Sequence, residues 1–125
     1  MRELIEIFRK NGIDVVVSKN PEIVAGQFEG AKISTALSVA KDTGVIFMGG
    51  ERERVESALA DHHVVVVKRE VIRSDTVSAF IEAEKKERIV FSSNSPSKTA
   101  DIEGELIFGM HGPKKLTVIL EDPEG

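Results

Sequence analysis

The sequence predicts an α/β fold, a three-layer α/β/α arrangement in which helices cover both faces of an open, mostly parallel sheet. Short runs of β-branched and aliphatic residues recur along the 125-residue chain, and stretches with helical spacing separate them. Each run is apolar on both faces, which is typical of strands that helices cover on two sides. The two patterns alternate roughly every 20 to 25 residues, as in successive strand and helix units.

The N-terminal third is expected to hold a helix, a strand and a short second helix. The apolar positions of the first helix share one face and are Leu4, Ile5 and Phe8. Asn11-Gly12 follow as a helix stop, and residues 15–17 are valines that form a strand. Asn20-Pro21 open the short helix, with the proline at its first position. Residues 33–36 form either a further strand or a loop.

The rest of the chain alternates strands and helices more clearly. Its apolar runs predict strands at residues 45–48, 64–67, 89–91 and 116–120. One helix follows Gly49-Gly50, and its apolar positions are Val55, Ala58 and Leu59. Another follows Ser74-Asp75, a plausible cap, and its apolar positions are Val77, Phe80 and Ile81. No linker or repeat divides the chain, so residues 1–125 are expected to form a single domain.

Composition limits the classes of function. The chain has no cysteine, so any iron–sulfur cluster must be held by a partner, and no cofactor or metal is expected on this chain. Its formal charge is −4, with bases interleaved among acids, which argues against a nucleic-acid partner. No apolar run approaches the roughly twenty residues of a membrane span, so a cytoplasmic protein without a membrane partner is expected.

Candidate chemistry gathers in the last quarter of the chain. Residues 92–103 contain hydroxyls, Lys98 and two acids directly after a predicted strand. Ligands of open α/β sheets bind beyond the carboxyl ends of strands, where free backbone N–H groups can hold a carboxylate or phosphate. The alternative is an ordinary helix start, with Ser97 or Thr99 as the N-cap and Asp101 and Glu103 favourable to the helix dipole.

The acids and histidines of the chain differ in how strongly they suggest a functional role. Asp101 and Glu103 would point about 200° apart on a regular helix, so at most one faces a ligand there. His111 lies in a flexible turn between Gly109 and Gly112-Pro113, where its imidazole can serve in acid–base chemistry or simply be exposed. His62-His63 precede a buried strand and point opposite ways, so they are expected to be structural.

Two motifs resemble the lactate-utilisation (LUD) domain family. They read Ser95-Pro96-Ser97-Lys98-Thr99-Ala100-Asp101-Ile102-Glu103 and Gly109-Met110-His111-Gly112-Pro113, and the earlier stretch Ala40-Lys41-Asp42-Thr43-Gly44-Val45 resembles the family's Ala-x-x-Thr-Gly-Thr. The match spans about residues 32–122. Ser95 stands where the family generally has glycine, and the chain is shorter than typical members on its N-terminal side.

The resemblance implies a NagB/RpiA/CoA-transferase-like fold and a component of the system that oxidises lactate to pyruvate. By matching position the resemblance marks eight motif residues: Thr43, Gly44, Ser97, Thr99, Asp101, Glu103, His111 and Gly112. Of these, His111 and Glu103 are our catalytic candidates. The substrate-binding candidates are the other six together with Ser95, which departs from the family pattern. The expected partners are a small carboxylate such as lactate and iron–sulfur subunits. Whether the chain also forms a homo-oligomer is left open. The alternatives are a non-catalytic accessory subunit of an iron–sulfur oxidoreductase complex and, by fold analogy, a sugar-phosphate or acyl-transfer enzyme.

Overall fold

The computed structural model describes residues 1–93 and 114–123. Within these residues the strands form two four-stranded sheets. The helices are α1 (Arg2–Lys10), α2 (Pro21–Ala25), α3 (Glu51–Leu59) and α4 (Thr76–Lys86), with a 3-10 turn at Arg69–Val71. The strands are β1 (Asp14–Ser18), β2 (Lys32–Thr35), β3 (Ser38–Ala40), β4 (Ile46–Gly49), β5 (His62–Val67), β6 (Ile72–Arg73), β7 (Val90–Ser93) and β8 (Lys115–Glu121).

The first sheet has the strand order β1-β8-β5-β2, and its three pairings are parallel. Its central strands are nearly continuous apolar runs: β5 and β8 are buried over almost their whole length, as strands covered on both faces must be. The edge strand β1 is half-buried through its three valines. The sheet therefore has the parallel, doubly covered character that the apolar runs predicted.

The second sheet has the order β6-β3-β4-β7 and mixed directions. β4 is antiparallel to both of its neighbours, β3 and β7, while β3 and β6 are parallel. It follows that β3, β6 and β7 run in one direction and end at the same edge of this sheet. That edge is where the candidate site lies.

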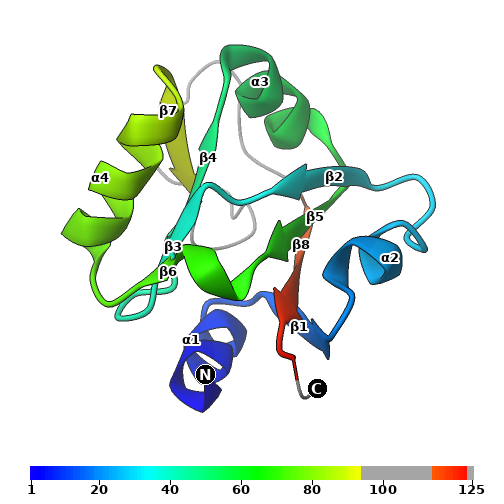
Figure 1. Ribbon diagram of the computed structural model, residues 1–125. Coiled ribbons are helices and arrows are strands. Elements are labelled where there is room, and N and C mark those ends of the chain that lie inside the picture. The colour runs from blue at the N-terminus through cyan, green and yellow to red at the C-terminus, as the bar shows by residue number, and fades with distance from the viewer. Residues whose placement is uncertain (94–113, 124–125) are drawn as a thin grey trace.

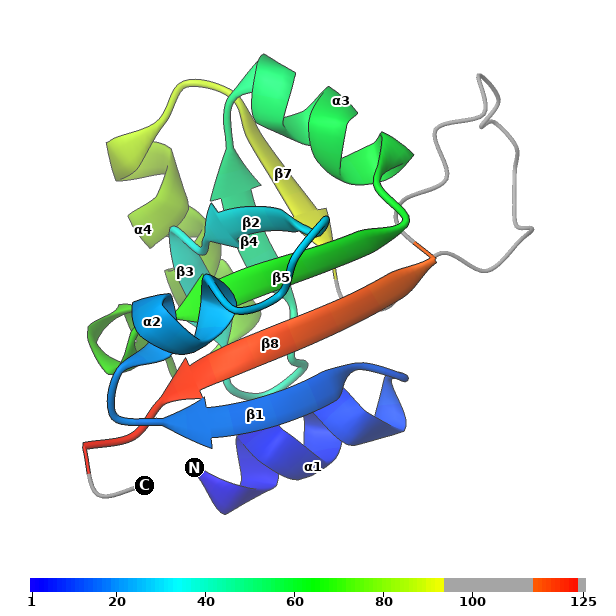
Figure 2. The ribbon, with the colours of Figure 1, turned by 90° about the vertical axis from the view of Figure 1, so that its right-hand side faces the viewer.

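The two sheets pack face to face between helices. α2 covers the outer face of the first sheet through Ala25, which packs with Val64, Val66 and Ile119. α4 covers the outer face of the second sheet through Ala79 and Ala83, which pack with Ala40 and Phe47. Figure 1 shows α4 and α2 on opposite sides of the molecule, with α3 above and α1 below the strands, and Figure 2 shows the same layers from the side.

The main apolar core fills the space between the sheets. It joins α1 to both sheets and comprises Leu4, Phe8, Ile13, Ala36, Val39, Ile46, Met48, Val65, Val67, Leu116, Val118 and Leu120. The amphipathic pattern of α1 explains its place, because Leu4 and Phe8 are fully buried while the charged residues on the other face are exposed.

The predicted α/β class with mostly parallel pairing is confirmed, since four of the six strand pairings are parallel. Each predicted strand is present, and residues 33–36 contain a strand. The sequence did not predict the division into two sheets. Nor did it predict β3 and β6, because strands of three and two residues are too short to show a pattern.

Two helices turn their largest apolar side chains outward, which the sequence did not predict. Leu59 of α3 is 67% exposed, and Val77, Phe80 and Ile81 of α4 are 68%, 41% and 48% exposed. α4 instead buries the small residues Ala79 and Ala83, which let a helix approach a sheet closely. Among the described residues, no helix is both long and apolar enough to cross a membrane.

Candidate functional site

The candidate site lies along the edge of the second sheet where β3, β6 and β7 end. Ala40 pairs with Arg73 across β3 and β6, and Ser93 pairs with Ile46 across β7 and β4. The turn of residues 41–45 joins β3 to β4, so it lies at this edge, as does the start of α4 just after β6. Because Ile46 follows Gly44 by two residues, the end of β7 lies beside the Thr43-Gly44 turn.

Gly44 is required by the geometry of this turn. Its φ is +77°, a left-handed conformation that favours glycine. Its amide donates to the Ala40 carbonyl at 2.8 Å, and a Cβ added there would lie 2.7 Å from Cγ2 of Ile7 and 3.2 Å from Nδ2 of Asn11. The turn is therefore packed closely against α1. The role of Gly44 is to allow this backbone conformation and this close approach.

Thr43 has an exposed side chain whose hydroxyl is bonded within the protein. Thr43 Oγ1 lies 3.0 Å from Oγ1 of Thr76, and it accepts a hydrogen bond from the Val45 amide at 3.3 Å. The Thr76 hydroxyl donates to Oδ1 of Asp42 at 3.2 Å. A chain of hydrogen bonds thus joins the turn to the first residue of α4.

The start of α4 is capped at the same edge. The Asp75 carboxylate accepts a hydrogen bond from the Ser78 amide at 2.8 Å, as the sequence predicted for this cap. This bond, with smaller contributions from neighbouring hydrogen bonds, lowers the pKa of Asp75. Asp75 is therefore fixed as a carboxylate that stabilises the helix start.

The structure describes two of the predicted site residues, Thr43 and Gly44, and brings both to the edge where β7 ends. The other candidates lie outside the described residues and are Ser95, Ser97, Thr99, Asp101, Glu103, His111 and Gly112. β7 ends at Ser93 and not at Phe91, so two of the serines after the predicted strand belong to the strand itself.

Comparison with known proteins identifies the family. Residues 31–120 match the LUD domain over most of the chain. The chain belongs to the LUD domain family.

One solved structure supports the fold of this LUD domain. It is the crystal structure of a DUF162 family protein from Deinococcus radiodurans, with a TM-score of 0.64 and 15% sequence identity, and the match covers 97% of this chain and 98% of that chain. At this identity the likeness shows the fold alone. No curated protein matches the chain by sequence.

The LUD domain also contains a partly buried polar network that the sequence analysis did not find. His63, on β5, lies 2.7 Å through Nε2 from Oγ of Ser34 on β2, and the Ser34 hydroxyl donates to Oε2 of Glu53 on α3. Because the serine proton goes to the carboxylate, His63 must donate from Nε2. Lys32 Nζ completes the network, 3.1 Å from Glu53 Oε1 and 2.7 Å from Glu56 Oε1.

His63 and Ser34 of this network are buried, whereas the side chains of Lys32, Glu53 and Glu56 are partly exposed. His63 is 1% exposed, and burial lowers its pKa to about 4, with Lys32 and His62 lowering it further and Glu53 opposing them. The network joins α3 to the first sheet, which explains why α3 stays in place with Leu59 exposed. His62 points to the other face of the sheet, where Nε2 lies 2.8 Å from Oγ1 of Thr117, so the predicted structural role of both histidines fits their contacts.

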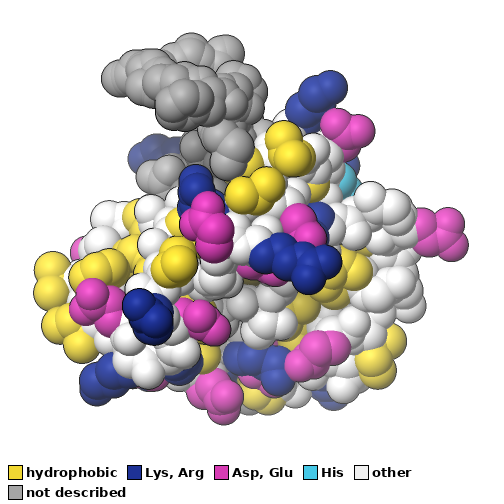
Figure 3. Space-filling view, turned by 90° about the horizontal axis from the view of Figure 1, so that it is seen from above, with side chains coloured by type: hydrophobic (Ala, Val, Ile, Leu, Met, Phe, Trp, Pro, Cys, Tyr) yellow, Lys and Arg dark blue, Asp and Glu magenta, His cyan; other side chains and the backbone are white. Residues whose placement is uncertain are grey.

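Sequence reasoning missed this network because Ser34 and Glu53 carry no motif. The sequence of β2 gave no signal either, because an apolar residue is expected on the buried face, yet in the structure Ser34 is buried and Ile33 is exposed. The surface over α3 mixes bases and acids, as Figure 3 shows, with ion pairs between Arg54 and Glu51 and between Arg52 and Glu56.

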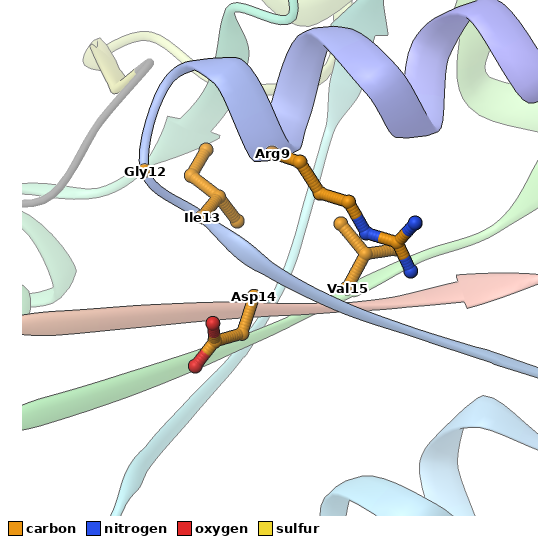
Figure 4. A pocket seen from close by; sticks show the side chains of 5 residues that line it. All are labelled: Arg9, Gly12, Ile13, Asp14 and Val15. Carbon is orange, nitrogen blue, oxygen red and sulfur yellow. The ribbon is translucent and has the colours of Figure 1, made fainter.

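A separate open hollow of about 540 Å³ lies between the end of α1 and the start of β1. Its lining residues are Arg9, Gly12, Ile13, Asp14 and Val15. Figure 4 shows Arg9 and Asp14 extending in different directions, and Asp14 is 3.6 Å from Nζ of Lys115. Neither Thr43 nor Gly44, the two predicted site residues that the structure describes, lines it. Among the described residues, no cluster of three or more His, Cys, Asp or Glu is arranged to hold a metal ion.

Replacing Gly44 by alanine should destabilise the protein more than the same change at Gly30. Both glycines have positive φ, +77° and +80°, so both changes carry the left-handed strain of about 1 to 2 kcal/mol. A Cβ at Gly30 meets nothing within 4 Å, whereas one at Gly44 meets Ile7 and Asn11. We expect an additional loss of about 1 to 3 kcal/mol for Gly44→Ala, measured by urea unfolding. Equal losses would contradict this account of the turn.

The buried His63 should make the protein less stable in mild acid. Its folded pKa is about 4 and its ordinary value 6.5, so the unfolded chain takes up the proton first as the pH falls through this window. Between pH 7 and pH 5 the wild type should lose about 2 kcal/mol more unfolding free energy than His63→Gln, in which the amide keeps a donor toward Ser34. Urea unfolding at both pH values measures this difference, and parallel losses would count against a neutral buried His63.

Proposed function

We propose that this LUD-domain protein binds a small carboxylate such as lactate and serves in the system that oxidises lactate to pyruvate. The location of the proposed site rests on one observation: β7 ends at Ser93, beside the Thr43-Gly44 turn. The family motif of residues 95–103 follows Ser93 in the chain by two residues. The Thr43-Gly44 turn and Ser93, the last described residue before the second motif, thus lie at one edge of a sheet although about fifty residues separate them in sequence, which supports a shared site.

In this proposal the carboxylate is held by hydroxyls and backbone N–H groups of residues 95–99, with Lys98 adding a positive charge. His111 or Glu103 takes the proton of the lactate hydroxyl, and a hydride or two electrons with the second proton pass to a partner. The chain has no cysteine, so iron–sulfur clusters that accept the electrons belong to partner subunits. The proposed compartment is the cytoplasm.

Calorimetric titration of the isolated protein with lactate tests the proposal. We expect saturable heat for the wild type and a loss of it in Thr99→Val, which removes a hydroxyl of the motif. Thr35→Val is the matched control, because Thr35 is an exposed threonine of β2 outside the proposed site. An absence of heat at millimolar lactate, or equal loss in the control, would argue against a carboxylate site in residues 95–99.

A second candidate function is a non-catalytic accessory subunit of an iron–sulfur oxidoreductase complex. The exposed apolar side chains of α4 favour it, since Val77, Phe80 and Ile81 form one stripe on an outer helix. Exposed apolar patches of this kind mark sites of protein association. No comparable observation among the described residues favours the alternative of a sugar-phosphate or acyl-transfer enzyme.

The two candidates differ in what they require of His111 and of α4. Protein isolated from native lysate should carry an iron–sulfur subunit, identified by mass spectrometry. An accessory role predicts that Phe80→Asp reduces the bound partner by about tenfold or more while His111→Ala leaves it unchanged. If the Phe80→Asp variant still binds the partner, the apolar stripe of α4 is not part of the interface.

A further inference from the structure

We propose that Thr76 is a positioning residue for the Thr43-Gly44 turn, and that the Thr43 hydroxyl holds this turn instead of contacting the ligand. Thr76 belongs to none of the family motifs quoted above. The inference rests on the proposed function, since it concerns the same edge of the second sheet. It changes the role of the motif residue Thr43 from binding the ligand to holding the turn in place.

The direction of each hydrogen bond follows from the groups involved. An ionised Asp42 carboxylate only accepts, so the Thr76 hydroxyl donates to it. The Thr76 proton is then committed, and the 3.0 Å contact with Thr43 requires Thr43 to donate to Thr76. Thr43 Oγ1 also accepts from the Val45 amide. The Thr43 hydroxyl proton is therefore used inside the protein and is not available to a carboxylate.

The turn is held by further contacts from two elements, α1 and β6. Asn11, at the end of α1, donates from Nδ2 to the Thr43 carbonyl at 3.3 Å. The Lys41 amide donates to the Arg73 carbonyl at the end of β6, at 2.8 Å. Gly44 packs against Ile7 of α1. Thr76 adds α4 to this set, so the turn is fixed relative to α1, β6 and α4 together.

This arrangement determines what the turn can offer a ligand. The Gly44 and Val45 amides are bonded within the turn. The Asp42 and Thr43 amides take no part in the hydrogen bonds that hold the turn as described above, so in this inference they are the groups that the turn offers a ligand. Their directions depend on the backbone of the turn. A change at Thr76 should therefore weaken binding without removing any group that touches the ligand.

A double-mutant cycle with lactate calorimetry tests this role. We expect Thr43→Val and Thr76→Val each to weaken lactate binding about fivefold, and the double variant to be no weaker than either single variant, because all three break one chain of hydrogen bonds. Thr76→Ser should retain wild-type affinity for lactate because serine keeps the hydroxyl. Thr35→Val should have no effect on this affinity. A loss in Thr43→Val with wild-type affinity in Thr76→Val would overturn the inference.

Amide hydrogen exchange measured by NMR gives an answer that does not depend on lactate. Thr43→Val and Thr76→Val should both speed exchange at the Val45 amide by about fivefold, while Thr76→Ser and Thr35→Val leave it at the wild-type rate. If the wild type gives no heat with lactate, the proposed function fails and exchange alone decides the positioning role. An unchanged Val45 rate in Thr76→Val would then reject it.

Discussion

The apolar layer between the two sheets is the contact on which the rest of the structure depends. Val65, Val118 and Leu120 from the first sheet meet Val39, Ile46 and Met48 from the second, and all are buried. Each such side chain contributes roughly 1.5 to 3 kcal/mol when removed from water. Leu4 and Phe8 of α1 enter the same layer, so α1 is fixed to both sheets at once.

The position of the candidate site follows from this layer. α1 is held by the core, and its far end supports the Thr43-Gly44 turn through Ile7 and Asn11. α1, β1 and α2 precede the region that matches the LUD domain, residues 31–120, yet β1 pairs with β8 along its whole length. Residues outside the matched region thus support a turn that carries one of the family's motifs.

The helices are attached to the sheets by different means. α1 uses large apolar side chains, α4 uses the small residues Ala79 and Ala83, and α3 relies on Ser34, Glu53 and His63. Close packing through alanine leaves the large side chains of α4 on the outer surface, and a polar attachment leaves Leu59 of α3 exposed. These exposed apolar surfaces result from how the helices are attached, and they are available for association.

The sequence by itself determined the α/β class, the order of the main strands and helices, and the family. Local patterns carry this information: valine-rich runs such as β5, the amphipathic face of α1, the Asp75 cap and the motif residues all lie within short windows. Gly44 was also visible as a turn residue, although its contact with Ile7 was not.

Only the tertiary structure decided which strands share a sheet, which faces of α3 and α4 are buried, and which side chains meet. The pairs Ser34 with His63 and Thr43 with Thr76 are separated by 29 and 33 residues, and no local pattern marks them as partners. The physical reason is that strand pairing and helix docking are set by burial of the whole apolar surface, so such contacts follow from the complete packing arrangement and not from any single segment.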